Sequence, residues 1–106
     1  MPSNLARFVV IFRARPGQLD ATYREYAERL RSLALREYGC LEFTSAFEDN
    51  QEIALSYWPS AEHIRAWKQD SEHRLAQDLG RNNWYRWYSV EVAEIQRSYL
   101  RETSHD

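Results

Sequence analysis

A run of hydrophobic residues between polar positions in the first part of the chain predicts a β-strand. The segment Arg7–Arg15 is rich in β-branched and aromatic residues, and Pro16-Gly17 follows it as a break. Apolar side chains occupy both of its faces: Phe8, Val10 and Phe12 on one, Val9 and Ile11 on the other. Both faces of this strand should therefore be covered in the folded protein.

In three later segments apolar side chains recur at every second position, so these are also predicted as strands: Cys40–Glu48, Gln51–Trp58 and Trp84–Tyr99. Only Asp49-Asn50 separates the first two, which predicts a β-hairpin. The final strand, Trp84–Tyr99, is long, and beyond it Leu100–Asp106 is polar and predicted to be a frayed tail.

Apolar residues recur at helical spacing between Leu19 and Glu37, with Gly39 as the expected stop. The opposite face of this helix is charged and should be solvated: Arg24, Glu28, Arg31 and Arg36.

A second helical region follows Ser60, a candidate N-cap, and covers Ala61–Lys68. Asp70 or Ser71 could cap a separate segment, Glu72–Leu79, which Gly80 would end. The sequence thus predicts a helix that is broken near its middle.

The order strand, helix, strand, strand, helix, strand predicts an α+β fold of the ferredoxin-like βαββαβ type. Four antiparallel strands would carry both helices on one face. The 106 residues have room for one domain, with a core over about 7–99. The apolar residues on both sides of the first strand indicate that a second copy of the chain covers the free face of the sheet, which makes a homodimer through sheet faces.

Composition narrows the classes of partner. The net charge of −2 argues against nucleic acid, and the third strand lacks the glycine and basic residues of the common RNA-binding module of this topology. The longest apolar run, Phe8–Phe12, is too short to cross a membrane, and no secretory signal begins the chain. Cys40 is the only cysteine, which fits a reducing cytoplasm. A cytoplasmic protein without nucleic-acid or membrane partners is expected.

A series of short motifs runs from about Arg7 to Tyr99. They are Arg15-Pro16-Gly17, Ile53-Ala54-Leu55-Ser56-Tyr57-Trp58-Pro59-Ser60, Ala66-Trp67, Glu72-His73, Gly80-Arg81, Trp84-Tyr85, Val90-Glu91-Val92-Ala93-Glu94-Ile95, Arg97 and Tyr99. In this order and spacing the chain resembles the antibiotic biosynthesis monooxygenase (ABM) domain family. The resemblance implies a dimeric α/β barrel of two ferredoxin-like protomers. The better-known activities of this family are oxygenation of polycyclic aromatic phenols without metal or flavin and haem degradation, and many of its members have no known activity.

Oxygenation without a cofactor needs an aromatic pocket and a base that removes a proton from a phenol or enol. The expected pocket lies between helices and sheet, with His73, Trp67 and Tyr88 as catalytic candidates. Five further residues are candidates for substrate binding: Tyr23, Tyr26, Trp58, His63 and Trp84. A simpler interpretation stays open, in which the rings are core and His63 lies at the surface. The sequence then predicts a non-catalytic homodimer that binds a small hydrophobic or aromatic ligand, or a stress protein with a vestigial cavity.

Haem degradation fits the residues less well. In the haem-degrading branch a tryptophan on the second helix is paired with a histidine ten residues on and with an asparagine on the first strand. Trp67 matches, but Gln77 occupies the histidine position and Phe8–Phe12 contains no asparagine. The three histidines show no spacing typical of a metal site. No cofactor and no metal are therefore expected.

Overall fold

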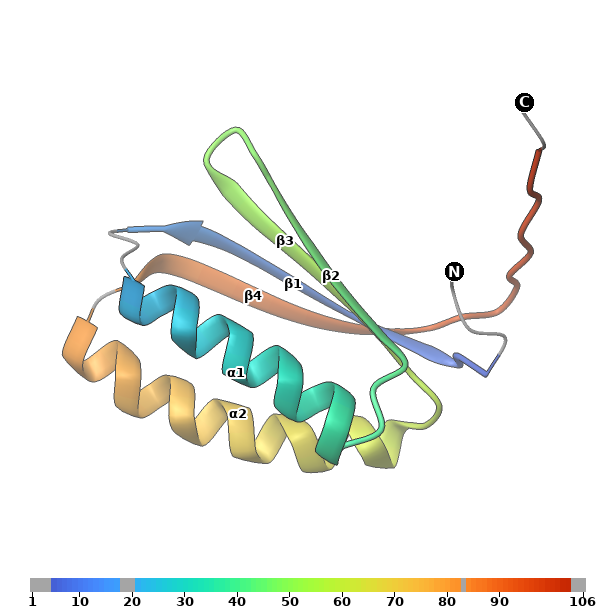
Figure 1. The fold of residues 1–106 in the computed structure, drawn as a ribbon, viewed down its shortest axis with the longest axis horizontal. Coiled ribbons are helices and arrows are strands. Elements are labelled where there is room, and N and C mark those ends of the chain that lie inside the picture. Colours follow the sequence, from blue (N-terminus) through green and yellow to red (C-terminus); the bar gives the residue numbers. More distant parts are fainter. Residues whose placement is uncertain (1–4, 18–20, 83, 104–106) are drawn as a thin grey trace.

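The protein is described here from a computed structural model covering residues 5–17, 21–82 and 84–103, with side chains from 72 to 82 left aside. Six elements follow one another: β1 Phe8–Pro16, α1 Ala21–Glu37, β2 Glu42–Glu48, β3 Gln51–Trp58, α2 Ala61–Asn82 and β4 Tyr85–Glu94. The strands form one sheet in the order β2-β3-β1-β4, and every neighbouring pair is antiparallel. Both helices lie on one face of the sheet (Figure 1). The predicted ferredoxin-like fold is confirmed.

Strand register separates the two faces of the sheet. Val10, Ala54 and the other buried residues of the central strands point toward the helices. Phe12 pairs with Ala54 on one side and with Val90 on the other, so these three side chains share the face covered by the helices. Val9 and Ile11 therefore point to the opposite face, where no helix lies.

The hairpin between β2 and β3 has the predicted two-residue turn. Asp49 and Asn50 both adopt positive φ, 51° and 59°. Two consecutive left-handed residues are the requirement of a type I′ turn, whose twist matches that of the flanking strands. Asp and Asn tolerate this conformation better than most residues, which explains why a turn forms here without glycine.

Gly39 ends α1, as predicted. Its φ of +78° is the left-handed conformation in which glycine has no steric penalty. Just beyond it, the Cys40 N–H donates to the Ala34 carbonyl at 3.0 Å and satisfies one of the last carbonyls of the helix. A Cβ at position 39 would lie only 2.7 Å from His63 Cδ2, so the start of α2 also requires glycine here.

The predicted break in the second helix is wrong, because α2 is continuous from Ala61 to Asn82. Ser71 does not cap a new segment; its hydroxyl donates back to the Lys68 carbonyl at 3.2 Å, a bond that a serine can make inside a helix. The Asp70 carboxylate instead accepts a hydrogen bond from the Tyr38 hydroxyl at 3.0 Å, which ties α2 to the end of α1. Gly80 lies within the helix and does not end it.

The last strand is shorter than predicted. It covers Tyr85–Glu94, and a register irregularity at Arg15/Pro16 marks its first pairs with β1. A final backbone bond joins the Ile95 N–H to the Arg7 carbonyl at 2.8 Å. Further on, residues up to 103 are exposed, and Tyr99 is 85% exposed. The alternation beyond Ile95 has no neighbouring strand within the described chain to pair with.

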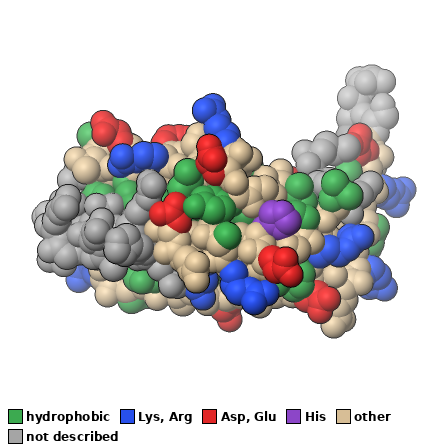
Figure 2. All heavy atoms as spheres, turned by 90° about the horizontal axis from the view of Figure 1, so that it is seen from below, with side chains coloured by type: hydrophobic (Ala, Val, Ile, Leu, Met, Phe, Trp, Pro, Cys, Tyr) green, Lys and Arg blue, Asp and Glu red, His purple; other side chains and the backbone are tan. Residues whose placement is uncertain are grey.

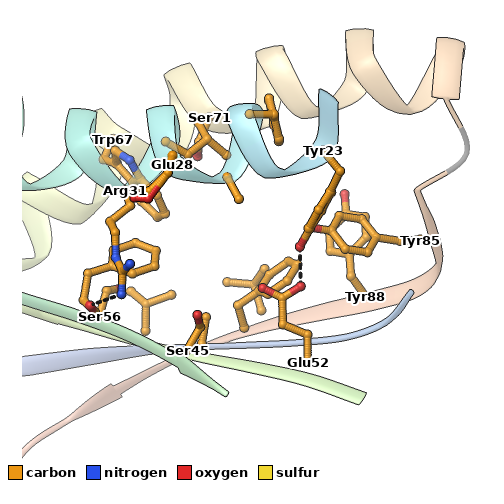
Figure 3. Close-up of a pocket in the computed structure, with 18 of the residues that line it drawn as sticks. Tyr23, Glu28, Arg31, Ser45, Glu52, Ser56, Trp67, Ser71, Tyr85 and Tyr88 are labelled. Atoms are coloured by element: carbon orange, nitrogen blue, oxygen red, sulfur yellow. Dashed lines mark hydrogen bonds between the residues drawn. The ribbon is translucent and has the colours of Figure 1, made fainter. Parts of the chain in front are cut away.

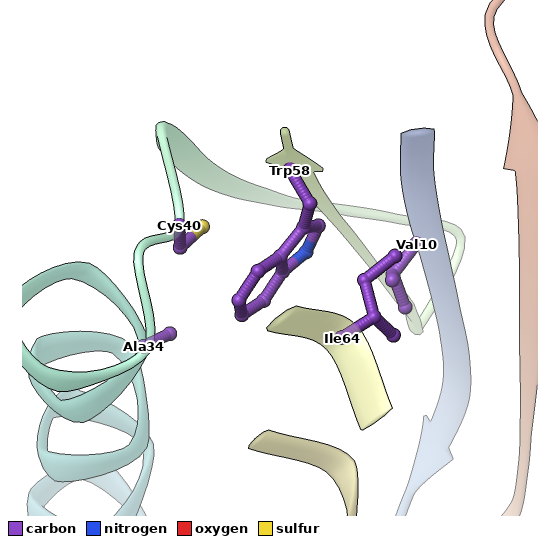
Figure 4. Packing of buried hydrophobic residues seen from close by; sticks show 5 residues of the cluster. All are labelled: Val10, Ala34, Cys40, Trp58 and Ile64. Carbon is purple, nitrogen blue, oxygen red and sulfur yellow. The ribbon is translucent and has the colours of Figure 1, made fainter. Parts of the chain in front are cut away.

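Two hydrophobic clusters lie between the sheet and the helices. The first contains Val10, Ala34, Cys40, Trp58 and Ile64, with the Trp58 ring at its centre (Figure 4). The second contains Tyr23, Tyr26 and Trp84, near the start of α1. The two clusters lie at different positions along the helices, and residues of both contribute to the wall of a cavity.

Side chains of both charges are scattered among apolar ones on the surface seen from below the helices (Figure 2). Over the part of the chain that the structure describes, no helix is long and apolar enough to cross a membrane.

Candidate functional site

A cavity of about 440 Å³ lies between the helices and the sheet. Its volume falls in the usual range for small-molecule sites, about 300–1,000 Å³. Aromatic and aliphatic side chains form most of the wall. Polar side chains are spread along it, and two polar places lie at opposite ends of the view in Figure 3. The aromatic wall residues are Phe12, Tyr23, Tyr26, Phe43, Phe47, Trp67, Tyr85 and Tyr88.

A chain of three hydroxyl and carboxyl groups forms the first polar place. The Tyr85 hydroxyl donates to the Tyr23 hydroxyl at 3.0 Å, and the Tyr23 hydroxyl donates to Glu52 Oε1 at 2.5 Å. The groups come from β4, α1 and β3, so the chain forms only when the fold brings these elements together (Figure 3). It ends on a carboxylate that is 8% exposed.

Burial has the largest effect on the pKa values of these three hydrogen-bonded groups. It raises the pKa of Glu52 above the usual value of 4.5, and the hydrogen bond from Tyr23 only partly opposes that shift. Burial also raises the pKa of Tyr23 and of Tyr85 far above the usual value of 10, and the neighbouring Glu52 carboxylate adds to the shift. Both tyrosines therefore stay protonated near neutral pH, and Glu52 is the group of the three that can take up a proton.

Trp67 and Arg31 form the second polar place, at the other end of the view in Figure 3. The Trp67 ring packs on Trp58, with centroids 5.3 Å apart, and its Nε1–H is buried without a hydrogen-bond partner among the described residues. Arg31 was predicted to lie on a solvated stripe. Instead it is half-buried. Its guanidinium donates to the Phe43 carbonyl at 2.9 Å, and its Cζ lies 5.8 Å from the centre of the Phe43 ring.

Four of the residues predicted for the site lie on the cavity wall: Tyr23, Tyr26, Trp67 and Tyr88. Two others lie in the hydrophobic clusters. Trp58 is fully buried and its Nε1–H donates to the Ser56 hydroxyl at 2.8 Å. Trp84 is 1% exposed and packs on Tyr26. Neither Trp58 nor Trp84 lines the cavity.

The predicted histidines have different places. His63 lies at the exposed start of α2, where its N–H donates to the Ser60 hydroxyl and its Nδ1 lies 2.5 Å from the same oxygen. It supports the helix N-terminus and does not line the cavity. His73 and Gln77 belong to α2, but their side chains lie outside the described residues, as does His105.

Glu52, Tyr85 and Arg31 were not predicted as site residues, although all three are polar residues of the cavity wall. A signal for Glu52 was present. Glu52, Ala54, Ser56 and Trp58 occupy every second position, so a carboxylate shares the face of a large ring. The apolar residues Ile53, Leu55 and Tyr57 on the opposite face indicated instead that that face is the buried one.

The described residues contain no group of three or more side chains suited to hold a metal ion. What the site offers is a mostly apolar cavity, a buried carboxylate held by a tyrosine pair, and a free indole N–H.

Comparisons with known proteins agree with this architecture. The family model described as antibiotic biosynthesis monooxygenase matches residues 7–79. The uncharacterized protein YqjZ of Bacillus subtilis is 39% identical over 101 residues, which covers 93% of this chain and 89% of that protein. A jasmonate monooxygenase of Pyricularia oryzae is 29% identical over 96 residues, 86% of this chain but only 44% of that protein.

Among solved structures, SnoaB of Streptomyces nogalater, a cofactor-independent oxygenase, superposes with a TM-score of 0.69. The match covers 92% of this chain and 99% of SnoaB at 15% identity, so it supports the fold alone. The family model covers most of the chain, and a relative is 39% identical over nearly its whole length. The chain therefore belongs to the antibiotic biosynthesis monooxygenase family.

Proposed function

We propose that the protein is a monooxygenase that uses no metal or organic cofactor and oxidises a small aromatic phenol, enol or quinone-type compound in this cavity. The observation that carries the proposal is the hydrogen-bonded series Tyr85–Tyr23–Glu52, which places a buried carboxylate in the wall of a mostly aromatic and aliphatic cavity. A passive binding site has no need for such a group, because a buried charge costs stability.

The reaction balances without a reductant. Loss of a proton from an acidic ring carbon or hydroxyl gives an electron-rich anion, which adds dioxygen to form a hydroperoxide. Loss of water from the hydroperoxide leaves a carbonyl. A CH₂ group and one O₂ thus become one C=O and one H₂O, and the substrate supplies all the electrons.

The wall suits a flat, apolar substrate. Phe12 and Tyr88 are stacked with centroids 5.8 Å apart, and Tyr85 meets Phe12 edge to face at 5.5 Å, so rings already surround the space. At the other end the free Nε1–H of Trp67 is a donor for a substrate oxygen. A substrate whose oxygen accepts this hydrogen bond would have its acidic C–H or O–H group at the end of the cavity where Glu52 lies.

One relative supports oxygenation, because it is a jasmonate monooxygenase. We also propose that the protein is a homodimer through the sheet face that carries no helix. The single buried, free Cys40 suits a cytoplasmic location.

The test is oxygen uptake by the purified protein with a panel of hydroxylated naphthacenes and anthrones. One O₂ should be consumed per product, and with ¹⁸O₂ one labelled atom should enter the product and one the water. Tight binding of these compounds without oxygen uptake would instead favour the non-catalytic ligand-binding protein.

A further inference from the structure

We propose that Glu52 is the catalytic base: its Oε2 takes the proton from the substrate atom that becomes oxidised. This inference rests on the proposed function, since it assigns a residue to the first step of that reaction. It replaces the histidine expected from the sequence with a carboxylate on β3.

The surroundings of Glu52 suit a base and not an ion pair. Across the sheet its neighbours are Ala14 of β1 and Phe47 of β2, neither of which is charged. Tyr23 faces it from α1 and Tyr85 lies next along from β4. Within the described part of the chain, no arginine, lysine or histidine forms an ion pair with its carboxylate. Buried glutamates that serve only stability are usually paired, so an unpaired one facing a cavity suggests chemistry.

The direction of the hydrogen bonds selects Glu52 over the tyrosines. Tyr85 donates to Tyr23, and Tyr23 donates to Oε1, so both hydroxyl protons are already committed toward the carboxylate. Oε2 has no protein partner among the described residues and belongs to a side chain of the cavity wall. The elevated pKa of Glu52 that burial produces makes it a stronger base than a surface glutamate.

The proton balance closes on this one carboxylate. Oε2 takes a proton from the substrate CH₂ and the electron pair stays on carbon. That carbon bonds to dioxygen, and the proton returns from Oε2 to the distal oxygen of the peroxide. The carboxylate then takes the second C–H proton while the O–O bond breaks. The departing hydroxide accepts that proton and leaves as water, so Glu52 ends ionised as it began.

The experiment uses anthrone, whose CH₂ becomes the second carbonyl of anthraquinone. Without oxygen, anthrone added to the wild-type protein should show the absorption of its bound anion. The Glu52→Gln variant keeps an oxygen for Tyr23 and should bind anthrone within about three-fold of wild type by tryptophan fluorescence. It should show no anion absorption, and its aerobic turnover should fall by about 10²–10⁴-fold.

Glu25→Gln is the matched control, because it removes the same charge from an exposed position of α1. It should keep both the anion absorption and the rate. Glu52→Asp, with a shorter carboxylate, provides a second variant if glutamine impairs folding; it should still form the anion, at a lower rate.

The outcomes separate the two proposals. Anion formation or turnover in Glu52→Gln at more than a tenth of the wild-type level overturns Glu52 as the base, even though oxygenation stands. No anion with the wild-type protein overturns it as well. Anion formation that depends on Glu52 but consumes no oxygen supports the base and contradicts the monooxygenase.

Discussion

At the scale of single residues, Glu52 combines burial with an ionisable group and no cationic partner. Its raised pKa means that the folded protein holds a proton on this carboxyl more tightly than the unfolded chain does. Below pH 4.5 both states are protonated and the group has no effect. As pH rises through the elevated pKa, the folded state alone bears the cost of a buried charge, so stability falls across that window.

The Glu52→Gln variant should therefore be at least as stable as wild type near neutral pH, and its stability should change less between pH 4.5 and neutrality. Thermal melting of both proteins across this range measures the difference. A variant that melts lower than wild type at neutral pH, with the same pH slope, would show that the carboxylate is stabilised by a partner. Glu25→Gln should follow the wild-type curve.

Tyr23 is expected to set the pH range in which Glu52 works. Its hydrogen bond lowers the pKa of Glu52 against the effect of burial, so Tyr23→Phe should raise that pKa further. The acid limb of the kcat/KM profile should move to higher pH, with activity recovered in more alkaline buffer. Tyr85→Phe, which removes a donor to Tyr23 and none to Glu52, should move the limb less. Equal shifts in both variants would contradict this order.

The residues of the site could be predicted only in part, because composition does not tell a cavity wall from a core. Tyr23, Trp58, Trp67 and Trp84 are all large rings at regular spacing, yet only Tyr23 and Trp67 line the cavity. Glu52 was missed for another reason. Its role depends on a hydroxyl 29 positions away on α1, a contact that no local pattern contains.

At the scale of elements, the junction between the end of α1 and the start of α2 depends on Gly39. Gly39→Ala would force a side chain into positive φ, which costs about 1 kcal/mol, and would place its Cβ 2.7 Å from the His63 ring. Because the two effects add, we expect the free energy of unfolding to fall by more than about 1 kcal/mol. Combining it with His63→Ala should recover only the steric part in chemical denaturation. Full recovery would show that the backbone conformation is not strained.

A continuous α2 and a broken one predict different effects of the Ser71→Ala substitution on stability. If Ser71 capped a second segment, Ser71→Ala would cost about 1 kcal/mol. Inside a helix, alanine has the higher propensity and the lost bond to the Lys68 carbonyl is one that competes with the helix, so the change should be within about 0.5 kcal/mol of neutral. Denaturant unfolding decides between the two. Helix-stop signals succeeded at Gly39 and failed at Gly80, because a stop also requires the chain to turn toward another element.

At the scale of the whole molecule, the sheet has one face covered by helices and one without. Ile53, Leu55 and Tyr57 of β3 lie on the open face together with Val9 and Ile11 of β1. Trp87, which pairs with Arg15 on the same face, is 42% exposed. A monomer of 106 residues would leave this central apolar surface in water, and a second sheet stacked on it would remove the exposure.

The register identifies which substitution tests that assembly. Val10 is in the core beside Trp58, whereas Val9 lies between Tyr57 and Ala93 on the open face. Sedimentation at micromolar concentration should give about twice 12.7 kDa for wild type and 12.7 kDa for Val9→Asp. A buried unpaired charge costs several kcal/mol, enough to separate the subunits. The variant should keep its circular dichroism, since Val9 contacts no helix. Ala66→Asp, on the exposed side of α2, should stay dimeric. A wild-type protein that sediments at 12.7 kDa would refute the dimer, and Val9→Asp sedimenting as a dimer would place the contact elsewhere.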